Sequence, residues 1–408
     1  MPSSKNRLFY GWVIVAAFFV ISTIMFGTLT SFGVFFKSMG SEFGLTRAAT
    51  SAVFSVQNLF GAVMSFVGGW AIDRFGPRIT ALFIGIFTGL ALVLTGQTNA
   101  YWQLFITYSL LFSVIGVVYT MIMSTVSRWF GKNRGLALGI SGSGIGLGTV
   151  ALAPLATYLI SSFGWRTAYV IMGIIVWAVI IPLSRLLRKN PPDIDAEPSA
   201  VKEDPAQIKS EDSAQNSELS LHEALRTRSF WLIGPIWLLN AFSYFLIVIH
   251  LVPHATDIGI PAMEAATILS LIGASYVAGR LLMGKVLDII GIKKTAITCA
   301  LLAALAMIWL IYSADLLMLY IFGIVFGFAN GGLDPCMAAL VGDTFGMRNI
   351  GIIMGTLQVN WGVGVIIGPA IGGLVFDINN SYFTAFLAGV AAMFAIALFV
   401  ALTRRETS

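Results

Sequence analysis

The sequence Gly69-Trp-Ala-Ile-Asp73-Arg74-Phe-Gly76-Pro-Arg78 returns 215 residues later as Gly284-Lys-Val-Leu-Asp288-Ile-Ile-Gly291-Ile-Lys293. Each copy follows an apolar segment long enough to cross a bilayer. Phe130-Gly131 and Pro154 recur at the same spacing, as Phe345-Gly346 and Pro369. The repeat predicts two equivalent halves with the same inside-outside sense, related by an axis along the membrane normal.

The composition is that of a membrane protein. Of the 408 residues, 57% are hydrophobic and only 11% are charged. A membrane-spanning helix needs about 20 predominantly apolar residues. We therefore expect an all-α integral membrane protein, whose first segment is retained because it is too long for the core of a signal peptide. The chain offers twelve such segments, near Trp12 to Phe36, Thr50 to Ile72, Ile79 to Leu94, Tyr101 to Val126, Leu136 to Ile160, Thr167 to Leu183, Phe230 to Val252, Ala262 to Met283, Thr295 to Tyr312, Leu316 to Val341, Ile350 to Phe376 and Phe383 to Leu402.

Lysine and arginine predict the orientation, because these residues favour cytoplasmic loops. If the amino terminus is inside, 20 of the 24 lysines and arginines lie on the cytoplasmic side, and only Lys37, Arg47 and Arg166 lie outside. The remaining cation, Arg280, lies within a span. We expect a multi-pass protein of the cell membrane with both termini in the cytoplasm. The basic balance then reflects orientation in the bilayer, and nucleic-acid binding is not expected.

The composition changes between the two halves. Residues 190–223 contain prolines, serines and acidic residues but almost no large apolar ones. This pattern is typical of a cytoplasmic linker. We expect a six-helix bundle at 1–188, a linker at 189–227 whose end includes a short surface helix, and a second six-helix bundle at 228–408.

The repeated motif resembles the loops of the major facilitator superfamily, and the resemblance covers essentially the whole chain. The small glycines Gly69 and Gly284 are expected to let neighbouring helices approach. The acidic residues can meet helix ends or the basic residues beside them. The resemblance implies two six-helix bundles and a gating role for the motif, which holds the inside closed in the outward-facing state. Its residues here are Gly69, Asp73, Arg74, Gly76, Arg78, Gly284, Asp288, Gly291 and Lys293.

Further stretches resemble the monocarboxylate transporters and their bacterial relatives, the oxalate-formate exchangers. They are Gly116-Val-Val-Tyr119, Arg128-Trp-Phe-Gly-Lys-Asn-Arg134-Gly, Arg226-Thr-Arg-Ser-Phe-Trp231 and Gly279-Arg280. The resemblance implies that Arg280 binds a substrate carboxylate. In the exchangers a lysine of the eleventh helix does so too, but here that position is Leu357. One intramembrane cation in place of two predicts a monoanion as the substrate.

Two other charges of the mammalian monocarboxylate transporters are missing. Their aspartate one helical turn before the arginine is replaced by Tyr276. Their lysine in the first helix falls near Leu29 or Thr30. The mammalian scheme of coupling therefore does not transfer to this chain.

Arg280 is also informative without the resemblance. A guanidinium stays charged, and placing it at membrane depth costs roughly 3 kcal/mol or more, so an anionic partner or a water-filled path is expected beside it. Arg280 precedes Asp288 by eight residues, about 12 Å along a helix. Asp334 precedes Asp343 by nine in a helix that crosses in the same direction, so Arg280 and Asp334 are expected to share a depth.

Asp334 occupies, after the shift of 215, the place of Tyr119, whose counterpart in the exchangers faces the substrate. We predict that Arg280 binds the substrate carboxylate in a bidentate way, that Tyr119 donates a hydrogen bond from the opposite half, and that Asp334 takes up a proton when substrate displaces it. The alternative is a static ion pair that holds the eighth and tenth helices together.

Several other polar residues are weaker candidates. His250 could titrate near neutral pH or simply be solvated, and Asp257 could attract protons or gate, or only shape an outer loop. Tyr276 is expected to orient Arg280. Further candidates for a cavity lining are Gln57, Asn58, Asn330, Asn360 and Cys336, although the amides could instead bond between helices.

The predicted function is proton-coupled transport of a small monocarboxylate, like lactate or pyruvate, by alternating access. An organic-anion antiporter of the oxalate-formate exchange type is the alternative. An enzyme is not expected, and neither is a cofactor or a metal, since Cys299 and Cys336 show no disulfide or metal pattern. The glycines of Gly142-x-Gly144-x-Gly146-x-Gly148 and Gly362-x-Gly364 are predicted to be packing and bending sites. The expected partners are the anion, the proton and the lipid bilayer, and a monomer is sufficient for the fold.

Overall fold

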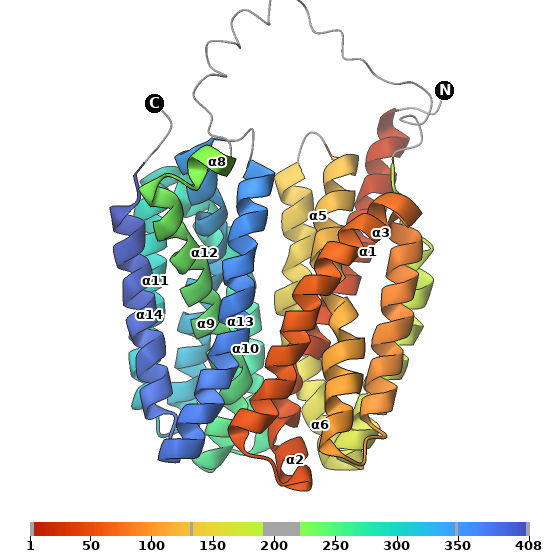
Figure 1. The fold of residues 1–408 in the computed structure, drawn as a ribbon, viewed down its shortest axis with the longest axis vertical. Coiled ribbons are helices and arrows are strands. Elements are labelled where there is room, and N and C mark those ends of the chain that lie inside the picture. Colours follow the sequence, from red (N-terminus) through yellow and green to blue (C-terminus); the bar gives the residue numbers. More distant parts are fainter. Residues whose placement is uncertain (1–3, 131–133, 191–220, 347–349, 405–408) are drawn as a thin grey trace, which may run out of the picture.

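The computed structural model describes residues 4–130, 134–190, 221–346 and 350–404, and these residues are helical apart from short connections. Ten of the helical stretches are long and apolar enough to cross a membrane. The start of α1 and the end of α14, which are the first and last described helix ends, lie at the same end of the molecule, called below the end that holds the termini (Figure 1). The first half contains α1 (Ser4–Thr30), α2 (Phe32–Phe43), α3 (Arg47–Thr95), α4 (Tyr101–Leu104), a π-helical stretch η1 (Phe105–Leu111), a 3-10 stretch η2 (Phe112–Gly116), α5 (Val117–Trp129) and α6 (Arg134–Ser184).

The second half begins with a short helix at the end of the predicted linker. Most of that linker, residues 191–220, lies outside the described residues. The remaining helices are α8 (Leu221–Ala224), α9 (Arg228–Asp257), α10 (Ala262–Ile290), α11 (Ile292–Ile311), α12 (Leu316–Phe345), α13 (Ile350–Asn379) and α14 (Phe383–Leu402).

Two of the ten stretches are broken by a glycine. In α3, Gly76 has φ 79° and ψ 165°, and in α6, Gly164 has φ 77° and ψ 159°. A side chain with a Cβ rarely adopts a positive φ, so a glycine is the natural residue at such a break. A straight helix of the 49 residues of α3 would be about 74 Å long. Because this exceeds the roughly 30 Å hydrocarbon core, the chain has to turn at Gly76.

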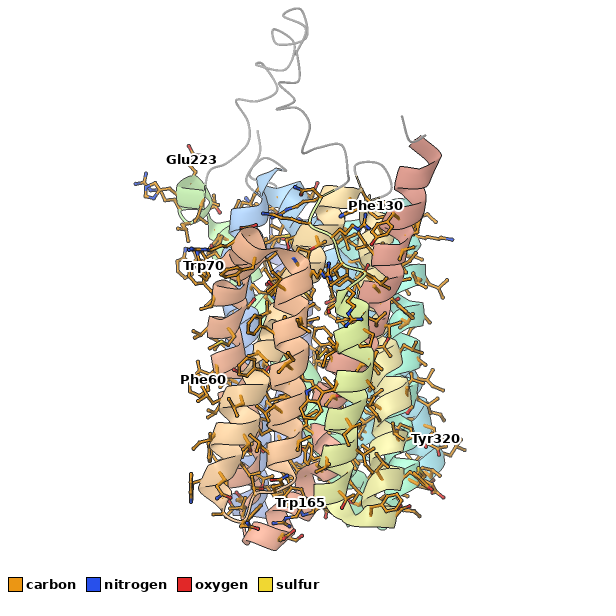
Figure 2. The ribbon with its side chains drawn as sticks, turned by 90° about the vertical axis from the view of Figure 1, so that its right-hand side faces the viewer. Phe60, Trp70, Phe130, Trp165, Glu223 and Tyr320 are labelled. Carbon is orange, nitrogen blue, oxygen red and sulfur yellow. The ribbon has the colours of Figure 1, made fainter. Side chains whose placement is uncertain are left out.

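The helices gather into two groups. In Figure 1 the red-to-yellow helices of the first half lie on one side and the green-to-blue helices of the second half on the other. The groups meet where α6 packs on α10, α3 on α13 and α2 on α9. Aromatic side chains lie toward both ends: Trp70 and Phe130 near the end that holds the termini, Trp165 at the opposite end (Figure 2). Tryptophan near both ends is typical of the two membrane interfaces.

The glycine series in α6 serves packing, as predicted. A Cβ at Gly144 would lie 2.4 Å from the Phe19 carbonyl oxygen of α1, and one at Gly146 would lie 2.6 Å from the Gly273 oxygen of α10. Successive residues of a helix point about 100° apart, so alternate glycines face different partners. The series therefore holds α6 against its own half with one face and against the other half with the next.

The predicted close approach at Gly69 and Gly284 is wrong. The nearest atom to a Cβ at Gly69 would be Thr120 Cγ2 at 3.9 Å, an ordinary contact, and Gly284 has open space. The tight contact is made by Gly68, whose Cβ would lie 2.1 Å from Val117 Cγ1. One residue of helix rotation separates the two positions, and the repeat alone does not give the rotational setting of the helix.

Candidate functional site

Arg280 and Asp334 form an ion pair, as predicted. Arg280 Nη1 on α10 lies 3.3 Å from Asp334 Oδ2 on α12. The Tyr276 hydroxyl, one turn from Arg280 on α10, donates to the same carboxylate oxygen at 2.6 Å. Tyr276 therefore holds the partner of Arg280. About a quarter of each charged side chain remains accessible, 23% for Arg280 and 27% for Asp334.

The ion pair faces the other half of the molecule. A Cβ at Gly142 of α6 would lie 3.8 Å from Arg280 Nη2. Tyr119 of α5 is 40% exposed, and its phenol lies within electrostatic range of both charges. The first half thus presents two uncharged residues to the ion pair, Gly142 and Tyr119.

The four amide residues predicted to line a cavity are mostly buried or bonded within their own helix. They are Gln57, Asn58, Asn330 and Asn360. Gln57 and Asn330 are almost fully buried, and the side-chain carbonyl oxygen of each has no hydrogen-bond partner in the described structure. Asn58 donates to the Phe54 carbonyl of its own helix. Asn360 is half-buried on α13 and lies close to Gly234 of α9.

The prediction that Cys336 is exposed to a cavity is wrong. Its side chain is fully buried, and Sγ donates to the Gly332 carbonyl at 3.2 Å. Cys336 is two residues from Asp334, so helix rotation turns it about 200° away from the ion pair. No group of three or more potential metal-binding side chains occurs within the described residues.

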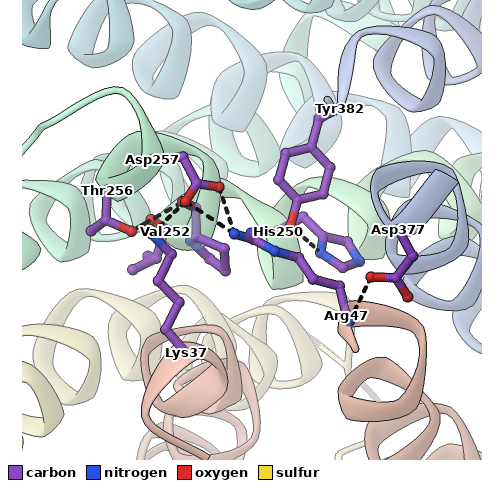
Figure 3. Close-up of polar contacts among 9 residues, drawn as sticks. Lys37, Arg47, His250, Val252, Thr256, Asp257, Asp377 and Tyr382 are labelled. Carbon is purple, nitrogen blue, oxygen red and sulfur yellow. Dashed lines mark hydrogen bonds and ion pairs between the residues drawn. The ribbon is translucent and has the colours of Figure 1, made fainter. Parts of the chain in front are cut away.

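A second polar cluster joins the halves (Figure 3). It includes a residue of α2, which lies at the end of the molecule opposite the start of α1 (Figure 1). Asp257 is the last residue of α9, so its assignment to a loop is wrong. One carboxylate oxygen lies 2.6 Å from Lys37 Nζ of α2, and the other lies 2.7 Å from Arg47 Nη2 of α3. Asp377 of α13 accepts hydrogen bonds from the backbone N–H groups of Arg47 at 2.8 Å and Ala48 at 2.7 Å. We call these five residues the outer closure.

His250 is buried beside the outer closure, so simple solvation is excluded. Its Nε2 lies 2.8 Å from the Pro369 carbonyl and its Nδ1 3.2 Å from the Tyr382 hydroxyl. A carbonyl only accepts, so we place the ring proton on Nε2. Burial raises the pKa of the Tyr382 hydroxyl. The hydroxyl therefore stays protonated and donates a hydrogen bond to His250 Nδ1. The Tyr382 oxygen in turn accepts from Arg47 Nη1 at 2.6 Å.

The repeated motif lies near the end that holds the termini. Within the described part of the chain, Asp73 pairs with Arg128 of α5 at 2.5 Å, and with neither Arg74 nor Arg78 beside it. Lys189 Nζ donates to the Asp73 carbonyl at 2.5 Å. In the second copy, Gly291 has φ 91°, and Lys293 Nζ donates to the Thr403 carbonyl at 2.5 Å. The side chain of Asp288 lies outside the described part of the structure.

The family model described as Major Facilitator Superfamily matches residues 17–284 and 238–408. The chain belongs to the major facilitator superfamily. Membership makes it a multi-pass membrane transporter and not an enzyme, in agreement with the expectation from its repeats.

Relatives within this superfamily are monocarboxylate transporters and an exchanger. Monocarboxylate transporter 13 of Bos taurus is 28% identical over 399 residues, which cover 95% of this chain and 87% of the relative. The Oxalate:formate antiporter of Oxalobacter formigenes is 27% identical over 406 residues, which cover 97% and 91%. These similarities confirm the predicted branch of the superfamily.

The major facilitator fold is also found among solved structures. A bacterial homologue of the human lysosomal transporter Spinster, crystallised in an inward-facing and unoccupied conformation, has a TM-score of 0.73 and 17% identity. The alignment covers 98% of this chain and 96% of that structure.

Sequence reasoning missed most of the outer closure. Lys37 and Arg47 carry a signal, because they are two of only three basic residues expected on the outer side, but this signal alone does not indicate a partner for either. Asp377 and Tyr382 carried none. Arg166, the third outer cation, pairs with Glu42 inside the first half.

Proposed function

We propose that this chain is a secondary transporter that moves a small monocarboxylate together with a proton by alternating access. The observation that carries the proposal is the partly exposed Arg280–Asp334 pair, held by Tyr276 and turned toward the other half. The ten helical stretches with two glycine breaks support twelve spans. We place bundles at 1–188 and 228–408, joined by a linker at 189–227, with both termini in the cytoplasm.

Substrate binding requires competition for Arg280. A carboxylate can accept two parallel N–H bonds from a guanidinium, whereas Asp334 occupies Nη1 at 3.3 Å, a long distance for an ion pair with a single contact. An incoming carboxylate that takes Arg280 leaves Asp334 without its cation. A carboxylate without a cation at membrane depth is stabilised by protonation, so binding of the anion favours uptake of one proton.

Release follows the reverse order. When the monocarboxylate leaves Arg280, the ion pair re-forms and Asp334 gives up its proton to the same side of the membrane. We expect Tyr119, which is partly exposed near both charges, to donate a hydrogen bond to the substrate from the first half. Anion and proton are thus bound and released together, and their charges cancel during the crossing.

The contacts between the halves support an inward-facing state. The outer closure and the approach of Gly146 to Gly273 lie on the side of Arg280 away from the termini. On the other side, Gly139 and Gly284 have open space around them. The similar solved structure is also described as inward-facing. We infer that Arg280 is reached here from the cytoplasm.

The test uses proteoliposomes and labelled lactate. Arg280→Gln is expected to abolish both uptake driven by a pH gradient and counterflow of labelled for unlabelled substrate. Asp334→Asn is expected to lose accumulation driven by the pH gradient but to keep counterflow, since the neutral amide imitates the protonated acid. Glu42→Gln is the matched control, because this acid pairs with Arg166 within one half.

Two results would contradict the proposal. Normal affinity and rate in Arg280→Gln would remove the carboxylate anchor, and accumulation by Asp334→Asn equal to that of the parent would exclude this residue as the proton carrier.

An anion antiporter is the second candidate, favoured by the similarity to the Oxalate:formate antiporter. Leu357 argues against a dianion, because it is fully buried at the position where the resemblance implies a lysine in the oxalate-formate exchangers. Liposomes loaded with buffer alone distinguish the two functions. A pH gradient drives accumulation by a symporter, whereas an obligate exchanger accumulates nothing without internal substrate.

A further inference from the structure

A row of aromatic rings adjoins the Arg280–Asp334 pair. The ring of Tyr276, which bonds to Asp334, has its centroid 6.0 Å from that of Tyr244 on α9. Tyr244 is followed by Phe245 at 5.3 Å, and Phe245 by Trp361 of α13 at 6.4 Å. Spacings of 4.5 to 7 Å are those of interacting rings. We call Tyr244, Phe245 and Trp361 the aromatic wall.

The aromatic wall lies between the two halves. The Phe245 ring lies 5.9 Å from Phe54 of α3, which belongs to the first half and is fully buried. Phe245 itself remains partly exposed, and so do Tyr244 and Trp361. Phe245 therefore places the aromatic wall beside the contact between the halves, and the Arg280–Asp334 pair also faces the other half.

Two polar atoms near the wall have no partner. The Trp237 ring packs 6.3 Å from Trp361, yet its indole N–H has no hydrogen bond within the described residues, although the residue is only 8% exposed. The side-chain oxygen of Asn240, one turn further along α9, is likewise buried and unpaired. Buried donors and acceptors are nearly always paired, so these atoms point to a ligand group or water beside the wall.

The residues of α13 near the wall are both polar and apolar: Gln358 is exposed and Asn360 is half-buried. Leu357 lies one turn before Trp361 and is fully buried. The wall therefore combines one cation at one end with several aromatic faces along its length. A two- or three-carbon acid bound at Arg280 is too short to cover those faces, and they would stay in contact with water.

We propose that the preferred substrate is a monocarboxylate that carries an aromatic ring. Its carboxylate binds Arg280, and its ring packs on Phe245 and Trp361. This inference rests on the proposed function and narrows its substrate class, so that acetate, lactate and pyruvate become the poorer ligands.

The test compares ligands that share a carboxylate and differ in the ring. The purified protein in lipid nanodiscs is titrated calorimetrically with phenylacetate, and acetate and lactate are measured by displacement of phenylacetate. Ring contacts of this kind are worth up to about 1.5 kcal/mol each, and 1.4 kcal/mol corresponds to tenfold in affinity. Two such contacts, with Phe245 and Trp361, contribute about 1–3 kcal/mol, so phenylacetate is expected to bind about tenfold more tightly than acetate. Equal affinity for the two acids would overturn the inference.

A substitution in the wall locates the effect. Trp361→Leu is expected to weaken phenylacetate binding about tenfold and to leave acetate binding unchanged, which also shows that the variant is folded. Trp102→Leu is the matched control, because Trp102 is 61% exposed and lies outside the wall. An equal loss for both acids in Trp361→Leu would also overturn the inference.

Failure of the inference and failure of the proposed function are distinguishable. If acetate and phenylacetate bind equally but both need Arg280, only the aromatic preference is refuted. If Arg280→Gln binds phenylacetate as well as the parent does, the carboxylate anchor itself is refuted.

Discussion

Asp377→Asn is expected to open the outer side of the transporter. In the parent, each carboxylate oxygen of Asp377 accepts one backbone N–H at the beginning of α3, from Arg47 at 2.8 Å and Ala48 at 2.7 Å. The carboxylate thus caps a helix that belongs to the other half, where negative charge is favoured by the helix dipole. Every such contact has to break when the halves separate on this side.

The free-energy change caused by Asp377→Asn follows from the hydrogen bond that asparagine can still accept. The amide keeps one acceptor oxygen, so the variant loses one hydrogen bond and the negative charge. A hydrogen bond to a charged group contributes about 1.5–3 kcal/mol, and the lower value applies because Asp377 is partly exposed to solvent. A loss of about 1.5 kcal/mol shifts the equilibrium toward the outward-open state roughly tenfold.

The assay measures access from outside. Ser51 is fully buried and lies 3.4 Å from His250 across the interface, so Ser51→Cys reports opening of this side. Labelling by a membrane-impermeant maleimide in right-side-out vesicles is expected to be about tenfold faster in Asp377→Asn/Ser51→Cys than in Ser51→Cys alone. The parent, whose Cys299 and Cys336 are buried, gives the background.

Glu42→Gln is the control for this experiment as well. Glu42 pairs with Arg166 and accepts from the Trp165 indole, and all three residues lie in the first half. Its substitution is expected to leave the labelling rate unchanged. An unchanged rate in Asp377→Asn, or the same acceleration in Glu42→Gln, would refute the reasoning.

The glycine contacts give three further predictions. Gly146→Ala places a Cβ 2.6 Å from the Gly273 carbonyl oxygen, so it is expected to push the halves apart and slow lactate counterflow at least tenfold; a normal rate would show that the contact is dispensable. Gly372→Val places a Cβ 2.5 Å from His250 Cδ2 and is expected to raise maleimide labelling of Ser51→Cys; an unchanged rate would separate His250 from the outer closure. Gly68→Ala overlaps Val117, with the Cβ 2.1 Å from Cγ1, whereas Gly69→Ala meets only an ordinary contact at 3.9 Å. Overpacking typically costs about 1–3 kcal/mol, so the melting temperature is expected to fall in Gly68→Ala and to hold in Gly69→Ala, and equal melting temperatures would contradict the assignment.

The ion pair of Arg280 with Asp334 could be predicted because it depends on few quantities. The rise of a helix is fixed, so eight or nine residues from an end give nearly the same depth. The repeat supplied the direction of both helices. Because an unpaired guanidinium at membrane depth costs free energy, Arg280 is expected to pair with an acid at the same depth. Nothing about the contact between the halves was needed, because α10 and α12 belong to the same half.

The outer closure was not predictable in the same way. Asp377 meets Arg47 across 330 positions of sequence, and the contact exists only because the two halves come together there. The wrong predictions for Gly69 and Cys336 have a simpler cause. The role of Gly69 was expected from the repeated motif and that of Cys336 from its closeness to Asp334, and a rotation of 100° or 200° turns such a residue away from the expected partner.

The outer closure and the Arg280–Asp334 pair differ in which half of the molecule supplies their charged groups. At the outer closure the acids Asp257 and Asp377 come from the second half, whereas the cations and the helix N-terminus come from the first. At the proposed substrate site both charges, Arg280 and Asp334, belong to the second half. A rocking motion therefore breaks the outer cluster and leaves the ion pair intact. It follows that substitutions in the outer closure change how often the site is open to each side, while the intrinsic affinity of Arg280 for a carboxylate stays the same.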